Sequence, residues 1–430
     1  MLNLILCKMG LPHLDVEVVQ KKQSCASTER VTELVMRHLA SEPGNATSTQ
    51  NLRDPELAEH IEEICLCADG HRPDEAPRVH TFRLEDGEPE IDTFGDGQGG
   101  EVTAATLRAL PSRALHGLWQ SLHFECGVHR DLLRYAETAL TLAANGLDAR
   151  LAGGQRLLLL HGPPGTGKTS LSRALAHKLA ARLRPRYPRA ALLEVDAHAL
   201  FSRWFSESGR LVAGLFGRAR ELAADPRMLL VLLLDEVESL ATARGPAAGG
   251  LEPADGMRAV NALLTQLDAL RSLPNVLVLA TSNLAGAVDA AFLDRADLVR
   301  RVGMPGHRAA YAVLSEATRE LMRAGAVRGE QLLALEQLEA VKLNCSATTA
   351  CSLRLRACAL TAVSCALSGR ALRRLPLLAL SLRESGQLPL SLDAFVSNLE
   401  STIRSHKSDA DSLAEDMNSI HLSNNIPNGR

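Results

Sequence analysis

Aromatic residues are scarce in this chain of 430 residues, at 3% of the total, with only two Trp and three Tyr. Charge of one sign is lacking too, because 47 Lys and Arg face 50 Asp and Glu, a net charge of -3. A near-neutral chain has no strong positive field to attract nucleic acid. We therefore expect no direct binding to DNA or RNA.

Long apolar runs are missing as well. No stretch approaches the roughly 18 apolar residues of a membrane-spanning helix, so no membrane association is expected. The opening MLNLILCKMG has no basic segment before its short apolar run and no clear cleavage site, which argues against a signal peptide. The nine cysteines have no paired zinc-ligand spacing and indicate free thiols in a reducing compartment. The length predicts two or three domains.

The clearest feature present is a phosphate-binding loop within residues 157–169, LLLLHGPPGTGKT. The leucines predict a buried parallel strand, and a helical pattern follows the loop. Glycines allow backbone N–H groups to surround phosphates, and the helix N-terminus adds the positive end of its dipole. Lys168 is predicted to meet the β- and γ-phosphates of ATP, and Thr169 to bind Mg²⁺. The predicted nucleotide-binding residues of this loop are Gly162, Pro163, Pro164, Gly165, Thr166, Gly167, Lys168 and Thr169.

Two further apolar strands end in polar side chains suited to catalysis. MLLVLLLDE places Asp235 and Glu236 after a strand, where Asp235 is predicted to hold Mg²⁺ and Glu236 to polarise the attacking water. NVLVLATSN ends in Asn283, which is predicted to position water beside the γ-phosphate. The competing interpretations are a charged turn after the first strand and a turn-capping Asn after the second.

Several arginines are candidates for stabilising the transferred phosphate. Arg295, in FLDRADLVRR, could reach the γ-phosphate of a neighbouring subunit in a ring, and Arg300 and Arg301 are rivals. A surface salt bridge is the ordinary alternative. Arg370 follows a possible helix cap at Ser368, and an arginine in a first helical turn opposes the dipole. That cost suggests a contact with the nucleotide of the same subunit.

An aromatic pair stands out in LFSRWFSESGR. Trp204 and Phe205 are adjacent, so they cannot both face one core, and polar residues surround them. An exposed loop that carries two aromatic side chains is favoured over core packing.

The order of patterns divides the chain into five parts. Residues 1–100 suggest an N-terminal α/β domain, with an acidic, glycine-rich loop or linker from Glu85 to Glu101. Residues 101–114 are a predicted linker. Strands and helices alternate over 115–305, which predicts an α/β fold with a doubly wound parallel sheet. Helical patterns alone fill 306–405, and the polar tail 406–430 is predicted to be disordered.

These pieces, in this order, resemble an AAA+ ATPase. LLHGPPGTGKTSL, LFSRWFSESG, DEVESL, MRAVNALLTQLD, ATSN, FLDRAD and SGRALRRLP are similar to the pachytene checkpoint protein 2 family, also called the thyroid hormone receptor-interacting protein 13 family. The resemblance is close from about Leu115 to Ala379. It implies roles for further residues: Asn283 as sensor 1, Arg295 as arginine finger, Arg370 as sensor 2, and Trp204 and Phe205 as the first pore loop, in which Ser206 replaces a common Gly.

The resemblance also implies a fold, partners and a function. The expected molecule is a homohexamer with a large ATPase domain, a C-terminal helical lid and an N-terminal domain that recognises substrate or adaptor. It would use ATP and Mg²⁺ to convert HORMA-domain proteins from closed to open conformers, delivered by a HORMA-like adaptor. Roles in spindle-checkpoint silencing, meiotic recombination, synapsis, oogenesis and spermatogenesis follow, in the nucleus, on chromosomes and in the cytoplasm. The alternatives are an AAA+ ATPase with other clients, a small-molecule P-loop kinase, and an ATP-binding scaffold without hydrolysis.

Overall fold

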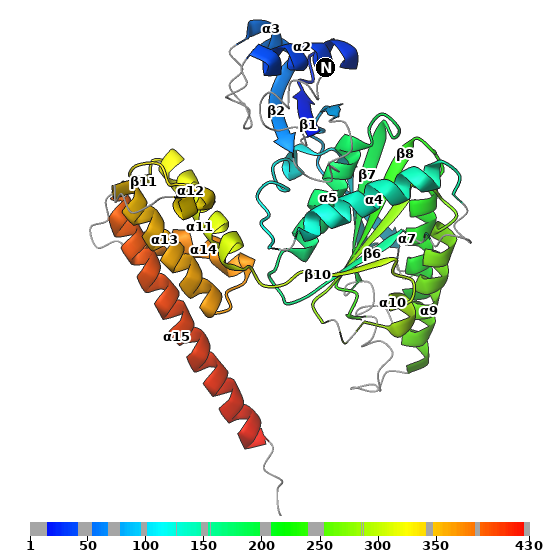
Figure 1. Ribbon diagram of the computed structural model, residues 1–430. Coiled ribbons are helices and arrows are strands. Elements are labelled where there is room, and N and C mark those ends of the chain that lie inside the picture. The colour runs from blue at the N-terminus through cyan, green and yellow to red at the C-terminus, as the bar shows by residue number, and fades with distance from the viewer. Residues whose placement is uncertain are drawn as a thin grey trace, which may run out of the picture. The chain divides into compact units, whose positions relative to one another are not determined.

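The structure is a computed structural model that divides into two compact units (Figure 1). It describes residues 15–41, 54–67, 78–95, 101–125, 127–147, 154, 156–197, 208–239, 253–284, 286, 288–340, 347–382 and 388–424. The first unit comprises residues 1–122, 127–162 and 168–302, and the second comprises 123–126, 163–167 and 303–430. The predicted helical lid is therefore a separate unit that also includes most of the phosphate-binding loop.

A small sheet with two helices forms the N-terminal part of the first unit. Its strands lie in the order β2-β1-β3, with β1 antiparallel to β2 and parallel to β3. Its own apolar core joins β1, β2 and α2, through residues such as Val18, Leu34 and Ile64. The expected N-terminal α/β domain is thus present. The elements are β1 (Asp15–Gln20), α2 (Thr28–Ser41), α3 (Pro55–His60), β2 (Ile61–Cys67) and β3 (Val79–Phe82).

A seven-stranded sheet forms the centre of the first unit, in the order β10-β6-β9-β8-β7-β5-β4. Its five strands from β10 to β7 are parallel, as predicted for a doubly wound sheet. The first two strands of the chain segment are antiparallel, so the sheet is mixed. The strands are β4 (Glu90–Gly95), β5 (Glu101–Leu110), β6 (Leu157–His161), β7 (Arg189–Asp196), β8 (Met228–Asp235), β9 (Val276–Ser282) and β10 (Leu298–Arg301).

The predictions of a loop or linker over residues 85–101 and of a linker over residues 101–114 are wrong, because the structure has two strands there. β4 and β5 form a hairpin, and β5 pairs with β7 along Thr106–Leu110. The 3₁₀ helix η1 (Arg113–Leu115) follows. The acidic composition of this segment indicated solvent exposure, and β4 satisfies that condition as an edge strand, where charged residues do not have to be buried.

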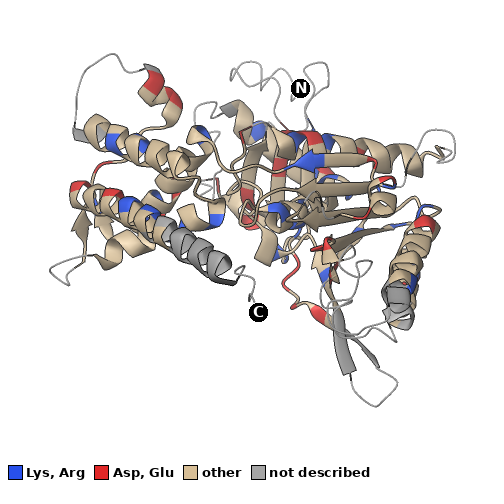
Figure 2. Cartoon of the chain, turned by 90° about the horizontal axis from the view of Figure 1, so that it is seen from below, with Lys and Arg blue, Asp and Glu red and all other residues tan. Residues whose placement is uncertain are grey.

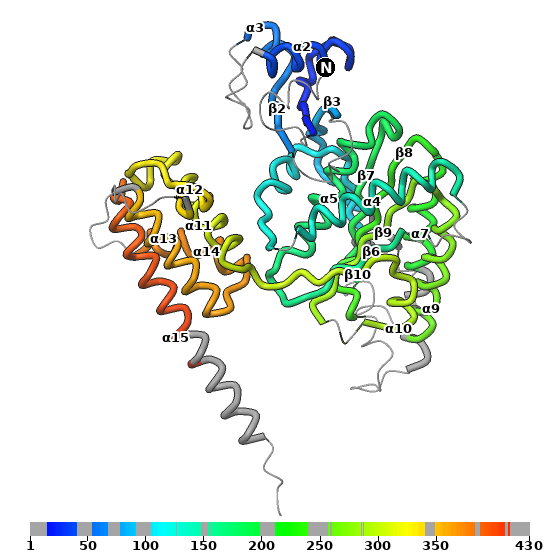
Figure 3. Tube along the Cα trace, in the orientation of Figure 1, coloured from blue at the N-terminus to red at the C-terminus, as the bar shows by residue number. Residues whose placement is uncertain are grey.

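Helices cover both faces of the large sheet. Leu159, Leu232 and Val278 belong to one core with residues of α7 and α9, while their strand neighbours such as Leu160 are equally buried. Successive strand residues point to opposite faces, which requires a second layer of helices, and α4 and α5 lie together there (Figures 1 and 3). The helices are α4 (Val128–Ala144), α5 (Lys168–Arg182), α7 (Ser208–Ala223), α9 (Pro253–Leu270) and the short α10 (Ala290–Leu293).

The second unit is a helical bundle with one short parallel strand pair. A single apolar core joins its helices, with Leu314, Leu375 and Phe395 completely buried. The elements are α11 (His307–Arg323), β11 (Val327–Arg328), α12 (Leu335–Ala340), α13 (Ala347–Ser364), α14 (Gly369–Ser381), β12 (Leu390–Ser391) and α15 (Leu392–Asn424). The last helix extends past Ser405 to Asn424, where the sequence predicted a disordered tail.

The structure also shows how charge, cysteine and apolar length are distributed over the described residues. Acidic and basic residues are interspersed along the described chain (Figure 2). Within the part of the chain that the structure describes, no disulfide joins Cys25, Cys65, Cys67, Cys351, Cys358 and Cys365. Among the described helices, none is both long enough and apolar enough to cross a bilayer.

Candidate ATPase site

The phosphate-binding lysine is held at the start of α5. Lys168 is buried, and its Nζ donates a hydrogen bond of 2.8 Å to the carbonyl of Gly162. Gly162 has a φ of +146°, and a Cβ at this position would lie 2.1 Å from the carbonyl oxygen of Val302. Glycine is therefore required where β6 enters the loop. The lysine lies at a helix N-terminus, where an anion is stabilised by the dipole.

Thr169 and Asp235 come together as predicted for a Mg²⁺ site. The Thr169 hydroxyl donates to the two Asp235 carboxylate oxygens over 2.9 and 3.1 Å. Asp235 ends β8 and Thr169 belongs to the first turn of α5, so the parallel sheet brings them to its carboxyl edge. A carboxylate and a hydroxyl are the hard oxygen ligands that Mg²⁺ prefers, and the remaining ligands would be phosphate and water.

Thr281 is a residue of this site that the sequence did not single out. Its hydroxyl donates a short hydrogen bond to Asp235 and accepts one of 3.3 Å from the backbone N–H of Glu236. Thr281 is 1% exposed, on β9 beside β8. It thus orients both acidic residues. The signal was present in the ATSN segment, two residues before Asn283, but a strand Thr resembles ordinary β-sheet composition.

Glu236 adopts a conformation unusual for its residue type. Its φ is +60°, in the left-handed region that few residues other than glycine adopt, and its side chain is exposed. Such strain concentrates at functional sites. The turn directs the chain away from β8 directly after Asp235, so that the two neighbouring carboxylates need not serve the same ligand.

Asn283 is tied to a second acidic residue. Its backbone N–H and its side-chain amide both donate to Glu238 Oε1, over 3.1 and 3.0 Å. Glu238 follows β8 and Asn283 follows β9, so this contact joins the two strand ends. The amide is oriented by Glu238, which the sequence analysis did not include.

Arg295 forms a bidentate ion pair within its own chain. Its Nε and Nη2 donate to the two Asp268 oxygens of α9 over 2.9 and 2.8 Å, and its Nη1 donates to the carbonyl of Ala291. The Asp268 carboxylate raises the pKa of this guanidinium. The ordinary salt-bridge alternative therefore describes its state in the single chain. Its rivals lie on the sheet-edge strand β10, where Arg301 is exposed.

In the second unit, the loop residue Gly165 contacts the start of α14. The Arg370 backbone N–H donates to the Gly165 carbonyl over 3.0 Å, and the Ser368 side chain caps the helix by accepting from the N–H of Ala371. Gly165 has a φ of +74°, and a Cβ there would lie 2.8 Å from Ser368 Oγ. The predicted cap is correct, and the structure brings Arg370 to the phosphate-binding loop. Thr166 closes the same loop by donating to Pro163.

The aromatic pair Trp204 and Phe205, with Ser206, lies outside the described residues. Its assignment remains a prediction.

Comparison with known proteins agrees with this geometry. Residues 158–304 match the family described as ATPase family associated with various cellular activities (AAA), and residues 306–407 match the TRIP13-like, AAA+ ATPase lid C-terminal domain. The chain is 40% identical over 391 residues to the pachytene checkpoint protein 2 homolog of Arabidopsis thaliana, covering 85% of this chain and 82% of that protein. It is 37% identical over 387 residues to the Canis lupus familiaris homolog, covering 87% and 88%.

A solved structure extends the similarity to the fold. The structure of C. elegans PCH-2 superposes with a TM-score of 0.75 at 29% identity, covering 92% of this chain and 99% of that one. The chain is an AAA+ ATPase that belongs to the pachytene checkpoint protein 2 family.

Proposed function

We propose that this ATPase works as a homohexamer that remodels HORMA-domain proteins, converting closed conformers to open ones. The observation that carries the proposal is the match of a lid of the TRIP13-like kind to residues 306–407, next to an intact set of ATPase residues. The relatives are named for a pachytene checkpoint, which supports a role in meiosis. We extend the proposal to meiotic recombination, synapsis and silencing of the spindle checkpoint. The proposal includes action in the nucleus, on chromosomes and in the cytoplasm.

Hydrolysis would use the residues gathered at the edge of the sheet. Thr169 and Asp235 would hold Mg²⁺, which supplies positive charge against the phosphates when it is bound. When nucleotide binds, Lys168 would give up its hydrogen bond to the Gly162 carbonyl and donate to phosphate oxygens instead. Glu236 would accept a proton from the attacking water, with its backbone held by Thr281. Arg370 would contact the nucleotide from the lid.

Exposed leucines on the lid support assembly into a ring. Leu377 is 71% exposed on α14, and Leu353 and Leu360 are 42% and 50% exposed, seven residues apart on α13. Leu353 and Leu360 share one face of α13, and exposed apolar residues on a shared face are suited to association with another chain. In such a ring, Arg295 would leave Asp268 and reach the γ-phosphate of the adjacent subunit. Trp204 and Phe205 would line the pore and pull a segment of the client.

The test uses purified full-length protein and a closed HORMA-domain client. Replacing both Trp204 and Phe205 with Ala should leave ATP turnover in place and stop client conversion. Glu236→Gln should retain ATP binding, lose hydrolysis by about 10²–10⁴-fold and hold the client without release. Glu221→Gln on α7, where an exposed Glu pairs with Arg218, is the matched control and should behave like wild type.

Three outcomes separate the alternatives. Full conversion by the Ala double variant would contradict the pore-loop assignment. Failure of the wild type to convert any HORMA client, with ATPase activity intact, would favour another client class. Early melting of the double variant would instead show that the aromatic pair belongs to a core, because burial of such residues contributes about 3–5 kcal/mol each.

A further inference from the structure

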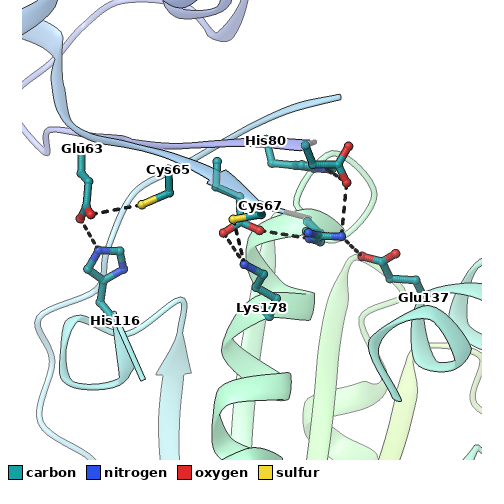
Figure 4. Close-up of polar contacts among 10 residues, drawn as sticks. Glu63, Cys65, Cys67, His80, His116, Glu137 and Lys178 are labelled. Carbon is teal, nitrogen blue, oxygen red and sulfur yellow. Dashed lines mark hydrogen bonds and ion pairs between the residues drawn. The ribbon is translucent and has the colours of Figure 1, made fainter. Parts of the chain in front are cut away.

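A cluster of charged residues is buried where the N-terminal sheet meets α5 (Figure 4). Lys178 Nζ lies 2.8 Å from Glu17 Oε2, and Arg182 Nε lies 3.1 Å from Glu17 Oε1. Arg182 Nη1 is also 3.4 Å from both Asp15 and Glu137. The side chains of Lys178 and Arg182 are each 2% exposed. Strand β1 thus provides Asp15 and Glu17, α4 provides Glu137, and the helix that begins at the phosphate-binding lysine provides the two basic residues.

Other groups complete this joint. Lys178 Nζ also contacts Cys67 Sγ at 3.3 Å and lies 5.6 Å from the centre of the Trp119 ring. Close by, the ring Nε2 of His116 lies 2.7 Å from the carboxylate Oε2 of Glu63 on β2 (Figure 4). A cavity of about 10 Å³ remains between these side chains, close to the space that one water needs. The joint is therefore polar and not fully packed.

The apolar part of the joint is small. It consists of Val19, Phe82, Leu84 and Ala181, whereas the N-terminal sheet has a larger separate core with α2. If the sheet left α5, that separate core would stay intact. The newly exposed surfaces would carry Glu17 and Asp15 on one side and Lys178 and Arg182 on the other, and all four are well hydrated in water.

Partial separation, in contrast, is unfavourable. An unpaired charge in a buried site loses its hydration without compensation, so these four residues favour either a closed joint or a fully open one. The carboxylate of Glu17 accepts from two cations, and despite the opposing effect of burial these partners lower its pKa. A joint with two discrete arrangements is the physical element that linkage between two sites needs.

We propose that this ionic joint is a releasable latch that links nucleotide binding at the N-terminus of α5 to docking of the N-terminal sheet near its C-terminus. Bound phosphates complete the cap of α5 at Lys168 and Thr169, which stabilises the helix on which Lys178 and Arg182 are presented. Nucleotide therefore favours the docked sheet. By reciprocity, docking raises nucleotide affinity by the same factor. The inference needs only the ATPase site and does not depend on the client.

The chain contains its own probe of the joint. Cys67 is 5% exposed and contacts Lys178, so alkylation of its thiol requires the sheet to leave α5. Cys25 is exposed and provides a reference within the same molecule. We would alkylate the full-length protein with a maleimide, with and without ADP, and measure each thiol by peptide mass spectrometry. ADP should slow the labelling of Cys67 by about fivefold or more, and leave Cys25 unchanged.

Three variants test the mechanism. In the Glu17→Gln variant, Cys67 should be alkylated rapidly with or without ADP. The variant should also bind ADP more weakly, by the same factor by which ADP slows Cys67 alkylation in the wild type. A double variant with Met at both Glu17 and Lys178 should keep the sheet docked, because apolar pairs of similar volume replace buried ion pairs well. In this variant, Cys67 should be alkylated slowly whether or not ADP is present. Arg173 lies on the same helix, α5, but away from the joint, and it pairs with Glu194 of β7. Arg173→Gln breaks this pair and should retain the ADP response.

The proposal is overturned if ADP does not change Cys67 labelling in the wild type, or if Glu17→Gln keeps the full ADP response. If Glu17→Gln does not fold, the Met double variant decides, because an ADP response in that variant would contradict a latch made of ions.

Discussion

At the scale of single residues, the site depends on contacts that no motif contains. Thr281→Val should keep the shape of the side chain and remove the hydroxyl that binds Asp235 and the N–H of Glu236. We expect kcat to fall about 10–100-fold, the usual cost of losing an orienting partner, with little change in nucleotide affinity. Phosphate release and fluorescent-nucleotide binding measure the two. Thr265→Val on the exposed face of α9 is the control, and an equal loss there would contradict the role of Thr281.

A buried histidine should govern part of the pH dependence of stability. Burial lowers the pKa of His177 to about 3, from 6.5 in an exposed chain, and its Nδ1 accepts from the Ser112 N–H over 3.2 Å. Between these values the unfolded chain binds a proton that the folded one does not, so stability present above pH 6.5 is lost as the pH falls. At pH 5 the loss is about 2 kcal/mol.

The measurement is the free energy of unfolding at pH 7 and pH 5. His177→Gln keeps an oxygen that can accept from Ser112 but cannot be protonated in this range. The variant should lose less stability than the wild type on acidification. Equal losses would show that His177 does not titrate between its folded and unfolded states in this way. Glu17 contributes separately at lower pH, because its pKa is lowered from 4.5 on folding.

At the scale of elements, two glycines distinguish a required backbone from a replaceable one. Gly162→Ala places a Cβ 2.1 Å from the Val302 carbonyl at a φ of +146°, and we expect a loss on the order of 3 kcal/mol or more together with loss of nucleotide binding. Gly217, inside α7, has no atom within 4 Å of the corresponding Cβ position. Gly217→Ala should therefore stabilise the helix by about 0.5–1 kcal/mol.

Thermal denaturation of both variants, with and without ADP, measures these effects. If the Gly162→Ala variant melts at the wild-type temperature and is still stabilised by ADP, the close approach of Gly162 to Val302 would be contradicted. A lower Tm for Gly217→Ala would contradict the open space that surrounds this position in α7.

At the scale of the whole molecule, the proposed role of Arg295 as an arginine finger can be tested in mixed assemblies. In one chain it is bound to Asp268, so a role at the phosphate requires a neighbouring subunit. Arg295→Ala and Glu236→Gln should each be inactive alone. Mixed, they form some interfaces with an intact Glu236 on one subunit and an intact Arg295 on the next, and partial recovery of ATPase activity is expected.

Native mass spectrometry of the mixture establishes that both variants share one assembly. If confirmed mixed assemblies recover no ATPase activity, the arginine-finger role would belong to Arg300 or Arg301, or the active site would lie within one chain. Asp268→Ala is a useful companion to Arg295→Ala, because this variant breaks the ion pair but keeps the Arg295 guanidinium. Its ATPase activity should be retained, since an exposed ion pair contributes only about 0–1 kcal/mol to stability.

The local patterns of the sequence determined the parallel sheet, the lid helices, the phosphate-binding loop and the pairing of Thr169 with Asp235. These features depend on short-range order: a run of leucines, a glycine loop before a helix, and acids directly after a strand. The sequence also determined the Ser368 cap of α14, because a helix cap needs only its immediate neighbours.

Tertiary structure alone decided the remaining features, because each joins segments that are distant in the chain. β5 is a strand through its pairing with β7, although its composition and that of β4 suggested a loop and linker. Thr281 and Glu238 become site residues only when β8 and β9 lie side by side. Arg295 meets Asp268, and Glu17 meets Lys178, only in the folded chain. Residue type shows that a charge is present, but the partner that stabilises a buried charge is chosen by packing.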